Sequence, residues 1–117
     1  MFIVYVKHYL TTEGIAFFHQ DWLPRVKSIM SQQIGYVAVI HDANNDNDDC
    51  VNVIVKFENE ETLNSWAAHP DHEYLVNALD LHRSRSYWEV ACVANDDTPH
   101  SIAEWEKIIP STQAAAK

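Results

Sequence analysis

FIVYVKHY, residues 2–9, is the stretch that decides the fold, because its β-branched and aromatic residues predict a strand. Successive side chains of a strand point to opposite faces of the sheet. Apolar residues occupy both faces, with Phe2, Val4 and Val6 on one and Ile3, Tyr5 and Tyr9 on the other. A sheet with one face in water would alternate apolar with polar residues, so both faces of this strand need cover.

Three further strands are predicted at about 36–41, 50–57 and 86–93. The strands at 36–41 and 86–93 repeat the two-sided apolar pattern. If only helices covered this sheet, the remaining face would expose a larger apolar patch than monomers usually carry. A second copy of the chain is the simplest cover, so we expect a homodimer.

Two helical regions separate these strands. Residues 13–32 carry apolar residues at steps of three and four, with Thr12 as the expected N-cap, a bend at Pro24 and a turn at Gly35. Asn59 is the expected N-cap of the second region, whose buried stripe is Leu63, Trp66 and Ala67. That helix breaks near His69, and a new segment starts at Pro70 with Leu75, Val76 and Leu79 inward.

The resulting order, βαββαβ, predicts an α+β, ferredoxin-like domain over residues 1–94, with a four-stranded antiparallel sheet. Residues 95–117 form a C-terminal extension, in which a capping box at 101–104 predicts a short helix at about 102–109.

The composition of the chain indicates which classes of binding partner are disfavoured. The chain has 117 residues and a formal net charge of −9, which disfavours nucleic acid and anionic membrane surfaces. The first residues resemble no targeting segment, so a cytoplasmic protein is expected. Cys50 and Cys92 are interpreted as reduced core residues, and the Asp- and Asn-rich run at 42–49 as a solvated hairpin loop rather than a calcium site.

Several short motifs resemble the antibiotic biosynthesis monooxygenase family of the dimeric α/β-barrel superfamily, over roughly residues 2–93. They are Val4-Tyr5-Val6, Gln33-Ile34-Gly35-Tyr36, and FENEETLNSW at 57–66 followed by His69-Pro70-Asp71-His72. The resemblance implies a pocket between sheet and helices, and a dimer built through the other sheet faces. It also implies oxidation of phenolic or quinol-type substrates by oxygen without an added cofactor, whereas other relatives degrade heme or isomerise a sugar-derived metabolite.

The family's functional residues carry over only in part. At the positions of the actinorhodin-type catalytic set, this chain has Val53, Phe57 and Leu63 in place of Asn, Trp and Tyr. At those of the heme-degrading set it has Lys7, Trp66 and Val76, of which only the tryptophan matches. Pro70 and His72 are the nearest equivalents of the isomerase's Pro-His pair.

We therefore expect a cofactor-independent monooxygenase that acts on a small aromatic, quinol or enol-type substrate. His72 and Lys7 are the candidate catalytic residues, and the candidate substrate-binding residues are Tyr5, Trp66, Val53 and Phe57. In the simpler interpretation, Trp66 is a core residue and Lys7 extends to water. No metal site is expected, because His69 and His72 lack an identifiable third ligand.

The alternative is a non-catalytic dimeric module of the same fold that binds a small molecule or a partner. A deep open pocket would favour the enzyme, and a pocket filled by its own side chains would favour the module.

Overall fold

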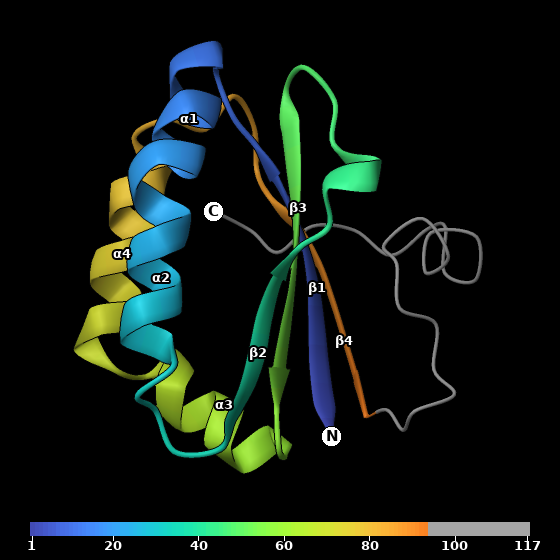
Figure 1. Cartoon of the computed structure of the whole chain (residues 1–117), viewed down its shortest axis with the longest axis vertical. Coiled ribbons are helices and arrows are strands. Elements are labelled where there is room, and N and C mark those ends of the chain that lie inside the picture. Colours follow the sequence, from blue (N-terminus) through green and yellow to red (C-terminus); the bar gives the residue numbers. More distant parts are fainter. Residues whose placement is uncertain (94–117) are drawn as a thin grey trace.

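The computed structural model describes residues 1–93, in which one helical layer covers one face of an antiparallel sheet (Figure 1). The strands are β1 (Phe2–Tyr9), β2 (Tyr36–His41), β3 (Cys50–Phe57) and β4 (Trp88–Val93). The helical elements are α1 (Thr12–Phe17), the π-helical turn η1 (Phe18–Trp22), α2 (Leu23–Met30), the 3-10 turn η2 (Ala43–Asn45), α3 (Glu60–Ala67) and α4 (Pro70–Asp80). The sheet order β2-β3-β1-β4 confirms the predicted ferredoxin-like α+β fold.

The predicted helix at 102–109 and the side chain of Cys92 lie outside what the structure describes. Cys50, by contrast, is buried in the core as predicted. No helix within residues 1–93 is long and apolar enough to cross a membrane.

β1 is one of the two inner strands of the sheet and is buried on both faces. Its inner face, toward the helices, carries Phe2, Val4 and Val6, which form one buried cluster. On the outer face Ile3 and Tyr5 are buried with Ile54 of β3, and Trp88 and Val90 pack beside them. The two-sided apolar character predicted for this strand is thus confirmed.

In the first helical region α1, η1 and α2 form one continuous helix, whose middle turn η1 is wider than an α-helical turn. In η1 the N–H of Leu23 donates to the carbonyl of Phe18, one residue further back than in an α-helix. Pro24 has no N–H and its ring would crowd the carbonyl four residues before it, so the wider turn accommodates the proline that was expected to bend the helix. The cap is Thr11 rather than Thr12, because the Thr11 hydroxyl accepts from the N–H of Gly14 at 3.1 Å.

The second helical region breaks where the sequence indicated. Asn59 caps α3 by accepting from the N–H of Thr62 at 2.9 Å. The imidazole of His69 caps α4, where its Nδ1 accepts from the N–H of Asp71 at 3.0 Å. Trp66 is buried as predicted, but Ala67 is exposed, because as the next residue of α3 it points about 100° further around the helix axis.

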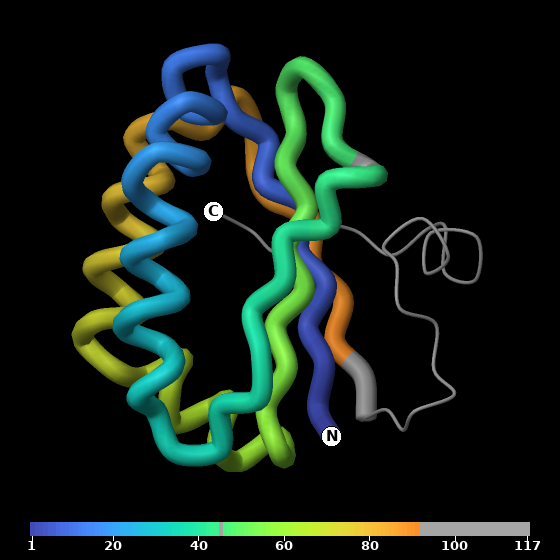
Figure 2. The backbone as a smooth tube through the Cα atoms, in the orientation of Figure 1, coloured from blue at the N-terminus to red at the C-terminus, as the bar shows by residue number. Residues whose placement is uncertain are grey.

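A tryptophan fastens the two helical regions to each other. The indole Nε1–H of Trp22 donates to the carbonyl of Leu75 in α4 at 2.7 Å, and its ring stacks on Phe18 at a centroid distance of 5.6 Å. Both rings are buried in the main core cluster. The α1–α2 path and α4 therefore lie side by side as one layer (Figure 2).

Gly35 is predicted to be intolerant of a side chain. Its φ of 82° is in the left-handed region, and an added Cβ would lie 2.4 Å from Thr62, which belongs to the α3 cap. We expect Gly35→Ala to lower the free energy of unfolding by about 1–3 kcal/mol, measured by denaturant titration. Ser65→Ala, an exposed change within α3, is the control, and equal midpoints for both variants would contradict the prediction.

Candidate active-site cleft

A cleft of about 800 Å³ lies between the inner face of the sheet and the helical layer. Its volume is within the range of pockets that hold small organic ligands. The walls are mainly apolar and include Val4, Val6, Val53, Trp66, Leu75 and Val76. Such walls exclude water from most of a bound molecule and leave orientation to a few polar groups.

Two polar residues of the cleft wall, His8 and Arg83, are hydrogen-bonded to each other, and Asp80 outside the wall holds Arg83. The Nε of Arg83 donates to Asp80 Oδ1 at 2.5 Å, and its Nη1 donates to His8 Nδ1 at 3.0 Å. His8 and Arg83 both line the cleft, and His8 is buried. The carboxylate thus holds the guanidinium, and the guanidinium orients the imidazole.

This arrangement fixes the protonation of His8. Burial, and secondly the positive charge of Arg83, lower the pKa of His8 to about 3, while Asp80 acts in the opposite direction. The imidazole is therefore neutral at ordinary pH. Because a guanidinium can only donate, Nδ1 is the acceptor and the proton is on Nε2. His8 thus supplies a neutral N–H donor in the wall of an apolar cleft.

Glu89 is a second ionisable group of the wall. Glu89 of β4 pairs with Val6 of β1, so its side chain is on the inner face of the sheet. His8 is on the same face, two residues after Val6. Partial loss of solvent around its carboxyl group raises the pKa of Glu89. Much of the Glu89 side chain is nevertheless exposed, and when it is ionised a carboxylate with a raised pKa is a stronger base than that of an ordinary glutamate.

Three of the predicted site residues lie together in this cleft. Trp66, His72 and Val53 all line it, and the His72 ring meets the face of Trp66 edge-on at a centroid distance of 5.5 Å. Phe57 is on the same side of the sheet but is fully buried in the core, where it packs against Tyr36. The roles proposed for Trp66, His72 and Val53 in binding or catalysis stay predictions.

Tyr5 and Lys7 lie on the other side of the sheet, which corrects their placement in the same pocket. Tyr5 pairs with Ile54 and Val90 in the outer layer, and the Lys7 ammonium lies 6.0 Å from the centre of the Trp88 ring. Both residues have the strand parity of Ile3, so neither can face the helices. The sequence could not reveal this, because both faces of β1 are apolar and either could have been the helical side.

His8, Arg83 and Glu89 were missed as site residues. The sequence did hold an indication of His8, because this residue continues the series Phe2, Val4 and Val6 on one face of the strand and is its polar member. It held none of Arg83, because Arg83 follows α4 in a connecting segment far from His8 in the sequence.

The buried neutral His8 predicts a loss of stability on acidification. In the unfolded chain its imidazole takes up a proton near pH 6.5, whereas in the folded chain it resists protonation down to about pH 3. The unfolded state then binds more protons within that window, so the free energy of unfolding falls as the pH falls. Between pH 6.5 and about pH 5 we expect wild type to lose about 1.5 kcal/mol more than His8→Gln, by denaturant titration.

Gln at this position can still accept a hydrogen bond from Arg83 but does not titrate. Parallel pH profiles for the two proteins would contradict the prediction, because they would mean that the pKa of His8 is the same in the folded and the unfolded chain.

Comparisons with known proteins identify the same fold. Neither a family model nor a curated protein sequence matches the chain. Among solved structures, an antibiotic biosynthesis monooxygenase has a TM-score of 0.70 at 15% identity and covers 81% of this chain and 99% of its own. A mutant of SnoaB from Streptomyces nogalater, a cofactor-independent oxygenase, has a TM-score of 0.68 at 16% identity over 85% of this chain and 98% of its own.

A further similar structure is a monooxygenase from the gene ActVA-Orf6 of Streptomyces coelicolor in complex with the ligand nanaomycin D. Its TM-score is 0.70 at 15% identity, over 86% of this chain and 92% of its own. At these identities the likeness shows a shared fold over nearly the whole of each relative.

Proposed function

We propose that this chain, which has the fold of the antibiotic biosynthesis monooxygenases, is a small-molecule oxygenase acting on a phenol, quinol or enol without an added cofactor. The observation that carries the proposal is the open, largely apolar cleft with a small set of oriented polar groups. A substrate of mostly apolar surface with one or two hydroxyl groups matches that distribution.

The chemistry needs a base and a dry site more than a metal. An ionised phenol or enol is electron-rich enough to pass an electron to oxygen, after which the two radicals combine. A phenolic C–H is then converted to a carbonyl, so that phenol plus O₂ gives quinone plus water. One oxygen atom enters the product, the other leaves as water, and the substrate supplies all the electrons.

Two groups of the cleft are suited to remove the proton. His72 lies against the buried ring of Trp66 in the cleft wall, and histidine is the side chain whose ordinary charge change lies near neutral pH. Glu89, with its raised pKa, is the other. The Nε2–H of neutral His8 would donate to a substrate oxygen and stabilise the negative charge that develops there.

The second candidate is a non-catalytic binding module of the same fold. It is favoured by Val53, Phe57 and Leu63, which stand where the actinorhodin-type resemblance places catalytic residues. Against it is the cleft itself, because the side chains of residues 1–93 leave that space open.

Oxygen uptake with a panel of phenols and quinols tests the oxygenase. We expect uptake with at least one substrate, and a fall of about 10²-fold or more in His72→Ala if this residue is the base. Leu63→Trp should also abolish uptake, because the indole would occupy the cleft that Leu63 lines.

Leu81→Trp, at a side chain that is 84% exposed, is the matched control for Leu63→Trp and should retain full uptake. Binding of a quinol by wild type with no oxygen uptake would instead identify the binding module.

We further propose that the outer sheet face forms a homodimer. Trp88 and Val90 are half-buried there, and Ile40 is 39% exposed beside Ile54. Ile40→Asp should convert the dimer to a monomer in sedimentation experiments, because it would bury an unpaired charge in the interface. Leu81→Asp is the control, and a monomeric wild type at high concentration would refute the dimer.

A further inference from the structure

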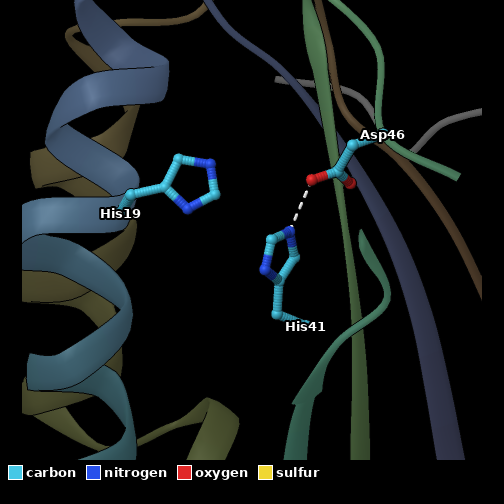
Figure 3. A group of neighbouring side chains, drawn as sticks. All are labelled: His19, His41 and Asp46. Atoms are coloured by element: carbon cyan, nitrogen blue, oxygen red, sulfur yellow. Dashed lines mark hydrogen bonds and ion pairs between the residues drawn. The ribbon is translucent and has the colours of Figure 1, made fainter. Parts of the chain in front are cut away.

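Three side chains that are distant in the sequence converge beside the sheet (Figure 3). His19 comes from η1, His41 from the last position of β2, and Asp46 from the loop that follows η2. One ligand atom from each lies within 4.8 Å of the other two. His41 Nε2 is 2.5 Å from Asp46 Oδ2, and the two imidazole rings are 5.1 Å apart at their centroids.

The carboxylate is held in place by a neighbour that leaves one oxygen for this cluster. Asp46 Oδ1 accepts from the backbone N–H of Asn52 at 2.9 Å and from its side-chain amide at 3.0 Å. Oδ2 is thereby directed toward His41, as Figure 3 shows. Hydrogen bonds of this kind orient metal-binding carboxylates in known sites.

The two imidazoles are positioned by a buried aromatic ring. Phe18 meets His19 edge-on at 5.1 Å and His41 edge-on at 5.4 Å. His19 follows Phe18 directly within η1, and π-helical turns occur often at functional sites. The wide turn is therefore the local feature that brings His19 toward the strand.

We propose that His19, His41 and Asp46 bind a divalent first-row transition-metal ion of the Zn²⁺ type, with solvent at the remaining position. Two imidazoles and one carboxylate are a ligand set typical of zinc sites with an open position. Calcium and magnesium prefer oxygen ligands throughout, so they fit this set poorly. His19 is exposed and the other two residues are half-buried, so water can reach the ion.

Local charge favours a cation at this place. The formal net charge of the chain is −9, and the loop at 42–49 adds Asp42, Asp48 and Asp49 to Asp46. A concentration of carboxylates raises the local cation concentration and its rate of association.

Binding requires only small side-chain movements. Zinc–ligand bonds of about 2.0–2.2 Å place tetrahedral donor atoms about 3.3 Å apart. His41 and Asp46 would separate slightly as the ion replaces the proton between them, and the exposed His19 would move inward. Metal binding commonly displaces a proton in this way.

This site is separate from the cleft and does not rest on the proposed oxygenase. None of the three residues is among those that line the cleft. An ion held between η1 and the β2–β3 loop would cross-link the helical layer to the sheet, so it should stabilise the folded chain.

Calorimetric titration of the full chain with ZnCl₂, after treatment with a chelator, tests the proposal. We expect one Zn²⁺ per chain, a rise in Tm with added Zn²⁺, and no comparable rise with Mg²⁺. His19→Ala should weaken binding about tenfold or more, and since this side chain is exposed the variant should fold normally. Asp46→Asn removes the charge but keeps an oxygen that can accept from Asn52, so it should weaken binding without releasing the loop.

His69→Asn is the matched control, because it removes an imidazole outside the cluster and keeps a good N-cap for α4. It should bind Zn²⁺ like wild type. Absence of Zn²⁺ binding by wild type, or unchanged affinity in His19→Ala, would overturn the proposal. Equal weakening in His69→Asn would also do so, because it would assign the ion to histidines elsewhere.

Discussion

The structure depends on burying both faces of β1, one of the two inner strands of its sheet. β1 has hydrogen-bonded neighbours on either edge, and apolar side chains extend above and below it. Helices cover one face, and the segments that carry them must therefore cross that face in succession. The cleft arises in the same place, between the inner residues of β1 and the helices fastened together by Trp22.

The elements of this fold were readable from sequence because each has a local physical cause. Strand alternation, the cap at Asn59 and the turn at Gly35 all act within a few residues, and their predicted places agree with the structure. The exceptions are also local. The cap shifted to Thr11, and Pro24 was accommodated by a wider turn instead of a simple bend, which helical periodicity alone does not reveal.

The cleft residues that could be predicted are those whose face follows from local periodicity. Trp66 and His72 lie in the cleft because the apolar stripes of α3 and α4 face the sheet. Which side of the sheet Tyr5 and Lys7 occupy depends on which apolar face packs against the helices. That packing is determined by the whole chain and not by β1 alone. The contact between His8 and Arg83, and the cluster of His19, His41 and Asp46, join distant segments and leave no spacing signal.

The π-helical turn η1 also sets the rotation of everything after it. An α-helical residue advances about 100° around the axis, so a chain one residue shorter within Phe18–Trp22 would present a different side of α2 to the sheet. Val26 and Met30, now buried, would then turn toward solvent. The length of this segment is therefore fixed by the need to keep Val26 and Met30 of α2 on the side that faces the sheet. Insertions or deletions are better tolerated in the neighbouring loops.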